Sequence, residues 1–168
     1  SIEEPNERET AVKKVTIVPL EAIIRNTAAG SLSKRLGLPE GTPLKTPVLE
    51  FSYKNDDLGD PMVNDYHILA MGLATREELD QIAEMSFAIN KMMVEFFKSV
   101  NVDLIDFKIE FGKTSDGKII LADEISPDTC RFWDSDTHEK LDKDRFRRDM
   151  GGVEEAYEEM MRRLGLRK

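Results

Sequence analysis

The alternation of apolar and charged residues is most regular in residues 104–112 of the chain. A second segment, which starts with the apolar Leu121 and Ala122, follows at residues 121–128, and the Ser115-Asp116-Gly117 segment between the two is a strong turn signal. The pattern predicts a β-hairpin whose first strand has two chemically different faces. The charged face carries Asp106, Lys108 and Glu110, and the apolar face carries Phe107, Ile109 and Phe111.

The expected register of this hairpin brings two carboxylates together. If Asp116 and Gly117 form a two-residue turn, Glu110 lies directly opposite Asp123 on the returning strand. Like charges in this position repel each other, so a divalent cation shared with phosphate oxygens is one way to neutralise them. A solvated hairpin face with alternating charge is the alternative interpretation, and the pattern alone leaves both open.

Periodicity elsewhere predicts further strands and helices around this hairpin. The predicted strands are residues 12–26, with an interruption at Pro19, and residues 48–54. The predicted helices are residues 30–37, 76–100 and 153–165. Thr75 and Glu78 have the spacing of a capping box, which marks the start of the long central helix. The expected fold class is therefore α+β (an α/β two-layer arrangement), with an antiparallel sheet and covering helices.

Composition narrows the class of protein. With 168 residues, 40% hydrophobic and 34% charged, the chain fits a soluble domain with its own core. Its net charge of −9 argues against a general nucleic-acid binder, although the basic residues are clustered, which suggests small anions as ligands. A single cysteine, Cys130, excludes an internal disulfide and is typical of a cytoplasmic protein. No apolar run approaches the ~20 residues of a membrane span.

Two segments are candidate anion sites. In residues 25–31, an arginine precedes small residues and a predicted helix start, which is the chemistry of a phosphate site. An ordinary capped helix beside a surface arginine is the alternative. In residues 142–148, Lys143 and Arg147 lie four residues apart and could present two cations to one phosphate or carboxylate. That segment could equally be a solvated charge run.

These segments resemble one known family. Residues 18–26 (VPLEAIIRN), with AAGS at 28–31, resemble the first signature of the phosphoribosylaminoimidazole-succinocarboxamide synthase (SAICAR synthetase) family. Residues 106–112 (DFKIEFG) and 123–128 (DEISPD) resemble its second signature. The similarity continues, in the family's order, through KNDD at 54–57, DPM at 60–62, RFWD at 131–134 and DKDRFR at 142–147. The resemblance therefore covers nearly the whole chain, and the motif sequences are most similar to those of bacterial members.

The resemblance implies an ATP-grasp-like ligase of purine biosynthesis. Members of the family join carboxyaminoimidazole ribonucleotide (CAIR) to L-aspartate and use ATP with Mg²⁺, releasing ADP and phosphate. The usual scheme passes through an acyl phosphate, which the amine of L-aspartate then displaces. The expected partners are these small molecules and a second copy of the chain in a dimer, with no nucleic acid and no membrane.

The matching positions imply individual roles. Lys108 would stabilise the transferred phosphoryl group with Asp106 beside it, and Glu110 and Asp123 would be the metal ligands. The implied substrate-binding residues are Arg25, Ser31, Asp128, Arg131, Lys143 and Arg147. The implied ATP-binding residues are Val15, Ile17, Lys54, Glu110 and Asp123, of which Val15 and Ile17 would contact adenine.

One departure from the family pattern affects the expected domain organisation. Family members begin with an additional lobe whose Gly-Lys-rich strand covers ATP, and this sequence contains no such strand. Residues 1–11 are therefore expected to be a polar lead-in left from a missing N-terminal lobe, and residues 12–168 the substrate- and metal-binding domain. The alternative function is that of a non-catalytic fragment that binds ribonucleotide or nucleotide phosphate without turnover.

Overall fold

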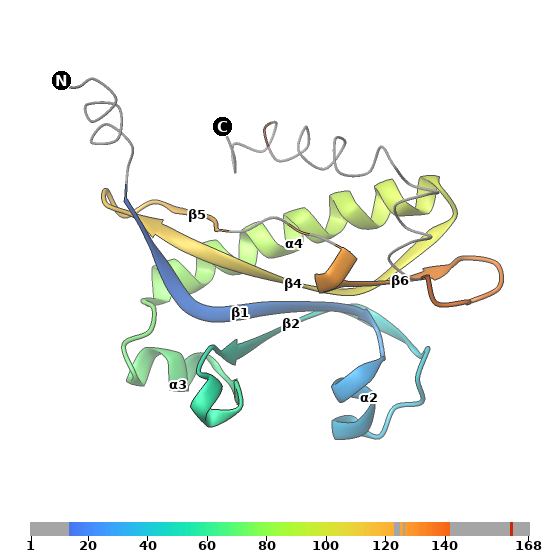
Figure 1. Ribbon diagram of the computed structural model, residues 1–168, viewed down its shortest axis with the longest axis horizontal. Coiled ribbons are helices and arrows are strands. Elements are labelled where there is room, and N and C mark those ends of the chain that lie inside the picture. The colour runs from blue at the N-terminus through green and yellow to red at the C-terminus, as the bar shows by residue number, and fades with distance from the viewer. Residues whose placement is uncertain (1–13, 123–124, 126, 142–161, 163–168) are drawn as a thin grey trace.

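The computed structural model of the protein describes residues 14–122, 125, 127–141 and 162. Its centre is a six-stranded sheet in the order β3-β2-β1-β4-β5, with β6 paired to β4 as well (Figure 1). Every strand pair is antiparallel. The strands are β1 (Val15–Thr27), β2 (Pro43–Tyr53), β3 (Met62–Val63), β4 (Val102–Thr114), β5 (Ile119–Leu121) and β6 (Cys130–Asp134). The predicted antiparallel sheet is confirmed.

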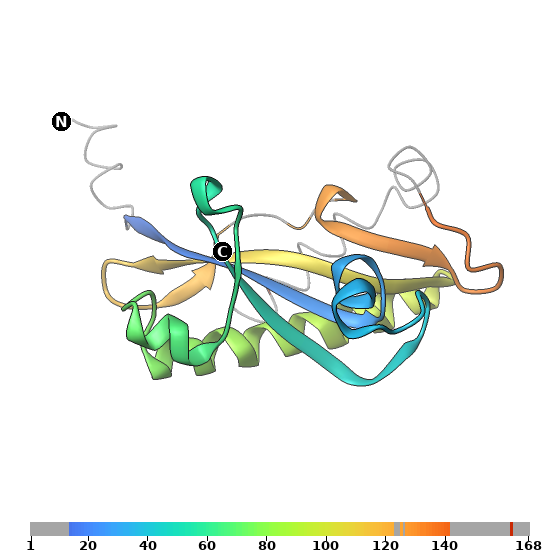
Figure 2. The ribbon, with the colours of Figure 1, turned by 90° about the horizontal axis from the view of Figure 1, so that it is seen from below.

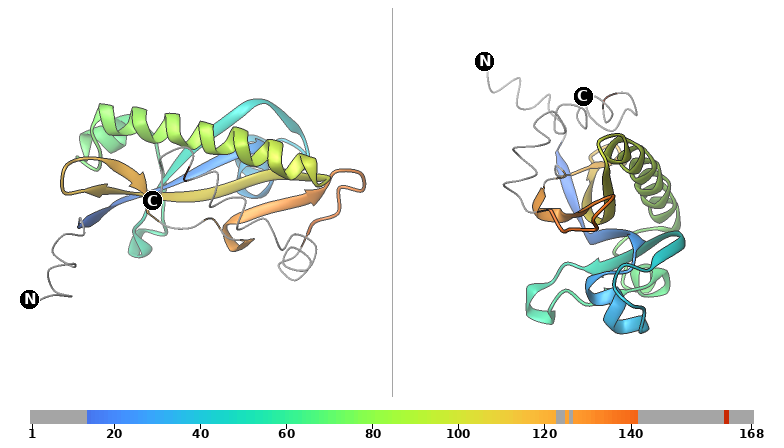
Figure 3. Two further views of the ribbon diagram at one scale, coloured as in Figure 1. Left: turned by 90° about the horizontal axis from the view of Figure 1, so that it is seen from above. Right: turned by 90° about the vertical axis from the view of Figure 1, so that its right-hand side faces the viewer.

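The helical elements are short except for one. They are α2 (Gly30–Leu36), α3 (Asp65–Ala70), α4 (Arg76–Ser99) and the 3-10 turns η1 (Asp56–Leu58) and η2 (Pro127–Thr129). The long α4 runs along one face of the sheet (Figures 2 and 3), and the opposite face, which no long helix of the described residues covers, is called the open face. No helix within the described part of the chain is both long and apolar enough to cross a membrane.

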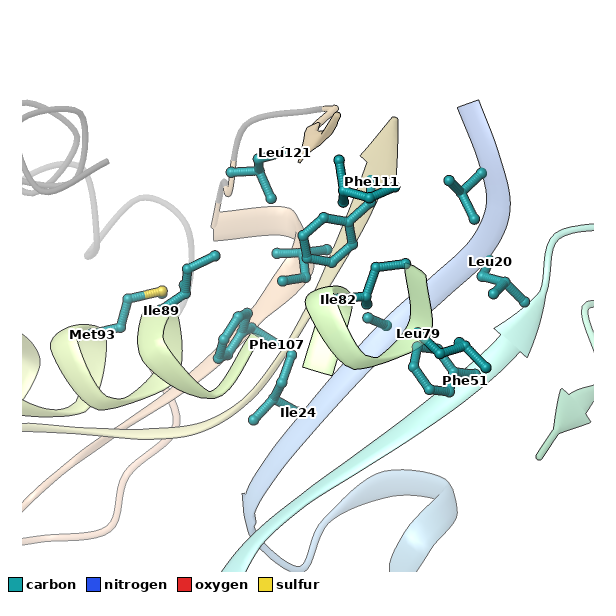
Figure 4. Packing of buried hydrophobic residues seen from close by; sticks show 14 of the residues in the cluster. Leu20, Ile24, Phe51, Leu79, Ile82, Ile89, Met93, Phe107, Phe111 and Leu121 are labelled. Carbon is teal, nitrogen blue, oxygen red and sulfur yellow. The ribbon is translucent and has the colours of Figure 1, made fainter. Parts of the chain in front are cut away.

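The hydrophobic core lies between α4 and the sheet. Side chains at helical spacing on α4 point onto Phe107 and Phe111 of β4 and Ile24 of β1 (Figure 4). Those α4 side chains are Leu79, Ile82, Ile89 and Met93, all at most 2% exposed. Because successive residues of a strand face opposite sides, burying Phe107, Ile109 and Phe111 under α4 turns their neighbours toward the open face.

The predicted capping box at the start of α4 is confirmed. The Thr75 hydroxyl accepts the Glu78 N–H at 3.1 Å, and the Thr75 N–H donates to Glu78 Oε1 at 2.9 Å. Glu78 also forms an ion pair with Lys113 of β4, with 2.6 Å between Oε2 and Nζ. The hydrogen bond from Lys113, followed by those from Thr75, lowers the pKa of Glu78 below its ordinary value. The cap therefore ties α4 to the sheet as well as to its own first turn.

This cap predicts an acid-dependent stability. A carboxylate whose pKa is lowered by folding stabilises the protein above its unfolded-state pKa, and the contribution is lost as the pH falls through the folded-state pKa. Glu78→Gln should therefore lower the free energy of unfolding by about 1 kcal/mol at pH 7, with a smaller difference below about pH 4. Urea unfolding at both pH values measures this. The neighbouring exposed Glu77→Gln is the matched control, and an equal effect in both variants would contradict the assignment.

Two strands differ in extent from the sequence prediction. β1 is one strand across Pro19, but its pairing with β4 is interrupted there, because the register shifts between Ile17 and Glu21. This irregularity accommodates a residue that has no N–H to give to the ladder. β2 begins at Pro43, five residues before the predicted start at Val48. The predicted C-terminal helix falls almost entirely outside the described residues.

The predicted hairpin is present, but its predicted register is wrong by one residue. Thr114 pairs with Lys118 through an N–H to carbonyl bond of 2.9 Å, so the loop has three residues, 115–117. Gly117 closes it with a φ of 86°, the left-handed conformation typical of three-residue hairpin loops. The Ala122 N–H consequently bonds to the Glu110 carbonyl at 3.0 Å, which places Ala122 opposite Glu110. The predicted direct opposition of Glu110 and Asp123 is therefore incorrect.

Candidate active site

The open face of the sheet carries the charged residues, and strand register arranges them in rows. In one row Arg25 of β1 lies opposite Asp106 of β4, which lies opposite Arg131 of β6. The next row pairs Ile23 with Lys108, and the row beyond it pairs Glu21 with Glu110. Since a strand advances about 3.3–3.4 Å per residue, the first and third rows are on the order of 13 Å apart.

A cleft of about 560 Å³ lies over these rows. Its walls are completed by α2, by Asp60 just after the turn η1 and by the turn η2, and the two turns project on the side of the sheet away from α4 (Figure 2). It is lined by Glu21, Ile23, Arg25, Ser31, Arg35, Ser52, Asp60, Met62, Asp106, Lys108, Asp128, Thr129, Cys130 and Arg131. The sequence-predicted residues Arg25, Ser31, Asp106, Lys108, Asp128 and Arg131 are thus brought together from five elements.

Arg25 is the buried cation at the base of the cleft, only 5% exposed. Its Nε donates to Glu50 Oε1 at 2.6 Å, and its Nη2 donates to the Ser31 hydroxyl at 3.1 Å. Its Nη1 lies 3.4 Å from Asp106 Oδ2. A buried guanidinium is tolerated only when its donors are paired, and here two carboxylates and a hydroxyl pair with it. The alternative of a surface arginine beside a capped helix is excluded, because Arg25 is not on the surface.

Glu50 is a part of this site that the sequence analysis missed. Its carboxylate accepts a hydrogen bond from Arg25 Nε. Each of its two oxygens also accepts from Arg35 Nη2, at 2.9 Å in both cases. Arg35, Glu50, Arg25, Asp106 and Arg131 therefore form a chain of alternating charge along one wall. Only the pairing of β1 with β2 brings Glu50 here, so no local motif could have identified it.

Asp106 occupies the position between two arginines. Its Oδ2 accepts from Arg131 Nη1 at 3.2 Å and from Arg25 Nη1 at 3.4 Å. A β-bulge makes this possible: the β4–β6 pairing shifts between Leu104 and Asp106, leaving Ile105 as the extra residue. Burial raises the pKa of the Asp106 carboxyl, an effect that Arg131, Arg25 and Lys108 oppose in that order. The three cations therefore favour the ionised form of Asp106, which burial disfavours.

A pair of directly opposed carboxylates does exist on the open face, on different strands from those predicted. Glu21 of β1 lies opposite Glu110 of β4. Lys54 neutralises part of this charge, with 2.6 Å between Nζ and Glu110 Oε2, and this hydrogen bond raises the pKa of Lys54. Lys108 Nζ lies 3.9 Å from Glu21 Oε1. Glu21 was also missed, although its even spacing from Arg25 on one strand was the available signal.

The metal prediction rests on one described residue and one that lies outside the described part. Glu110 faces the open side of the sheet, where its carboxylate could ligate a hard cation such as Mg²⁺. Asp123 lies outside the described residues, as do Lys143 and Arg147. Within the part that the structure describes, no group of three or more His, Cys, Asp or Glu residues is arranged to hold a metal ion.

The two predicted adenine contacts lie at the start of β1, outside the 560 Å³ cleft. Val15 covers Gly112 of β4, where a Cβ on residue 112 would collide with the valine side chain. Gly112 shares the open face with Glu110, so Val15 extends this face with an apolar surface. Ile17 is 50% exposed and lines a separate groove of about 410 Å³ beside α4.

Cys130 lines the cleft but lacks the character of a nucleophile. Burial raises the pKa of its thiol to about 12. The thiol is therefore protonated at neutral pH, and only a thiolate attacks efficiently. The chemistry of the cleft rests on its cations and carboxylates.

Comparison with known proteins gives this geometry a family. The SAICAR synthetase family model matches residues 1–164. Phosphoribosylaminoimidazole-succinocarboxamide synthase from Clostridium botulinum (strain Eklund 17B / Type B) is 64% identical over 163 residues, which are 97% of this chain and 69% of that protein. The synthase of the same name from Lachnoclostridium phytofermentans is 62% identical over 165 residues, covering 98% of this chain and 70% of that protein.

Solved structures agree with the sequence comparison. The crystal structure of phosphoribosylaminoimidazole-succinocarboxamide synthase from Ehrlichia chaffeensis has a TM-score of 0.74 at 49% identity, covering 94% of this chain and 68% of that one. A SAICAR synthetase in complex with ADP has a TM-score of 0.74 at 44% identity, covering 96% of this chain and 76% of that one. The Saccharomyces cerevisiae SAICAR-synthase complexed with SAICAR shares the fold, with a TM-score of 0.65 at 24% identity, over 86% and 52%.

The sheet, its charged cleft and these similarities define an enzyme, a ligase of purine biosynthesis. The chain belongs to the SAICAR synthetase family. The resemblance seen in the sequence motifs is thereby confirmed.

Proposed function

We propose that this protein joins CAIR to L-aspartate, using ATP with Mg²⁺ and passing through an acyl phosphate. The observation that carries the proposal is the order of charge across the open face. Arginines surround Asp106 at one end of the cleft, Lys108 follows in the middle row, and Glu21 lines the other end, opposite Glu110 on the neighbouring strand. A ribonucleotide whose phosphate meets the arginines would extend its carboxylate toward Lys108, next to a metal ion held by the acidic end.

In this proposal the arginine end holds the ribonucleotide phosphate. Arg25 and Arg131 provide forked donors, and Ser31 provides a hydroxyl within 3.1 Å of the Arg25 guanidinium. Asp106 keeps both guanidinium groups in place. Asp128 lines the same wall of the cleft, and Lys143 and Arg147 are further candidates for this substrate. ATP and the metal would bind at the other end.

The carboxylate end would receive ATP and magnesium. Glu110 and Asp123 would hold Mg²⁺, which would neutralise negative charge on the ATP phosphates, with Lys54 beside Glu110 as a further phosphate contact. Val15 and Ile17 would contact adenine. Lys108, between the two ends, would stabilise the charge on the phosphoryl group as it passes to the CAIR carboxylate. The amine of L-aspartate would then attack the acyl phosphate and release phosphate.

A coupled assay of ADP release tests the proposed reaction. ADP release that requires both CAIR and L-aspartate would support the ligase. The alternative, binding without turnover, is favoured if calorimetry detects CAIR binding while ADP release stays at the background of a protein-free sample. A protein that binds neither CAIR nor ATP and releases no ADP would contradict both hypotheses.

The assignment of the arginine end predicts a selective defect. Arg131→Ala should raise the KM for CAIR by about 10- to 100-fold and leave the KM for ATP nearly unchanged, because it removes a charged hydrogen bond worth about 1.5–3 kcal/mol. Steady-state kinetics with each substrate varied in turn measures this. Arg76→Ala, on the exposed start of α4, is the control for removal of an arginine. A rise confined to the KM for ATP would mean that the two substrates are placed the wrong way round.

A further inference from the structure

Gly30 lies in contact with the guanidinium of Arg131. It is the first residue of α2 and has a φ of +56°, in the left-handed region. A Cβ at this position would lie 2.5 Å from Nη2 and 2.8 Å from Cζ of Arg131, and closer still to Nη1. The space that any other side chain would need is therefore occupied by the arginine.

Arg131 has few other restraints. Its side chain is 46% exposed, and its one ion pair in the described structure joins Nη1 to Asp106 Oδ2 at 3.2 Å. It also lines both the main cleft and a second cavity of about 320 Å³. A long side chain between two cavities has many accessible rotamers, and fixing it costs conformational entropy. A neighbouring surface that blocks some of these rotamers reduces the number of conformations that Arg131 samples.

We propose that Gly30 is a positioning residue for the ligase reaction: its missing side chain forms the seat that holds the Arg131 guanidinium against Asp106 and toward the cleft. The role of Arg131 toward the ribonucleotide rests on the proposed function, whereas the seat itself rests on the contact geometry. The groups that would collide are the far end of a flexible side chain. A methyl group at position 30 would therefore displace Arg131 and leave the backbone in place.

The same helix supplies a matched control. Gly37 ends α2 with a φ of +68°, and a Cβ there would meet no atom within 4 Å. Gly30→Ala and Gly37→Ala therefore carry the same kind of left-handed backbone penalty. Only the first variant places a methyl group in the Arg131 seat. Both should lower the Tm by a similar amount, so a difference between them in ligand binding is not a difference in folding.

The first test is structural and needs no substrate. Crystal structures of both variants should show the Arg131 guanidinium moved away from Asp106 in Gly30→Ala and unmoved in Gly37→Ala. If Arg131 Nη1 stays within hydrogen-bond distance of Asp106 in Gly30→Ala, the proposal is wrong. This comparison tests whether Gly30 positions the Arg131 guanidinium, and it does so even if the ligase assignment is wrong.

The second test measures CAIR binding by calorimetry in a double-mutant cycle. Gly30→Ala should weaken CAIR binding by about tenfold, and Gly37→Ala should change it by less than about twofold. Gly30→Ala combined with Arg131→Ala should bind no more weakly than Arg131→Ala alone, because the methyl group acts only through the arginine. Additive losses would overturn the proposal. Wild-type protein that fails to bind CAIR would instead refute the proposed function.

Discussion

Replacing Lys108 with alanine should lower kcat by about 10²- to 10³-fold, with a much smaller change in the KM for CAIR or ATP. Lys108 lies in the middle row of the cleft, on the same face as the arginines and the glutamate pair. Its ammonium is 3.9 Å from Glu21, a loose contact that leaves it able to move toward a phosphoryl group. Charge that appears only in the transition state is stabilised by such a cation, so the loss falls on kcat.

Lys118→Ala is the control for this experiment. Lys118 lies in the same hairpin, is exposed, and is remote from the cleft lining. Single-turnover measurements with saturating CAIR, ATP and L-aspartate separate the chemical step from product release. A Lys108→Ala variant that keeps wild-type single-turnover rates would rule out a role in phosphoryl transfer. A loss expressed wholly in the KM for CAIR would make Lys108 a binding residue.

Replacing Arg25 with alanine should lower the free energy of unfolding by about 3 kcal/mol and abolish CAIR binding at millimolar concentrations. The arginine is 5% exposed, and it pairs with Glu50, Asp106 and Ser31 at once. Its removal leaves two largely buried carboxylates with one cation each, Arg35 for Glu50 and Arg131 for Asp106. Breaking a buried ion pair is costly because the remaining charge stays desolvated.

The pH dependence of this defect distinguishes its cause. Burial raises the folded-state pKa of Asp106, so the ionised carboxylate opposes folding as the pH rises through that pKa, and protonation relieves the cost. The Arg25→Ala defect in urea unfolding should therefore shrink as the pH falls toward the carboxyl range. Arg35→Ala, at the exposed end of the same charge chain, should cost less than about 1 kcal/mol. Equal costs for both variants would contradict the central position of Arg25.

Much of the site was predictable because it follows from strand alternation and from family motifs. Asp106, Lys108 and Glu110 share a face for the simple reason that they are spaced by two on one strand. Arg25, Ser31 and Arg131 came from motifs, and the structure brings all three to one cleft. Of the residues that were missed, Arg35 and Glu50 have no signature of their own, and Glu21 could be recognised only by its even spacing from Arg25 on one strand. Each becomes part of the site through pairing of β1 with β2 and β4, or through the packing of α2.

The sequence by itself determined the local elements: the α4 helix through its capping box and apolar spacing, the two-faced β4 strand, and the family. Each of these depends on residues close together in the chain. The tertiary structure alone decided the registers. A left-handed Gly117 in a three-residue loop placed Ala122 opposite Glu110, and a bulge at Ile105 placed Asp106 between two arginines. A shift of one residue in strand pairing moves every side chain of the strand to the opposite face of the sheet. The register is determined by the geometry of the turn and by pairing with strands that are distant in the sequence.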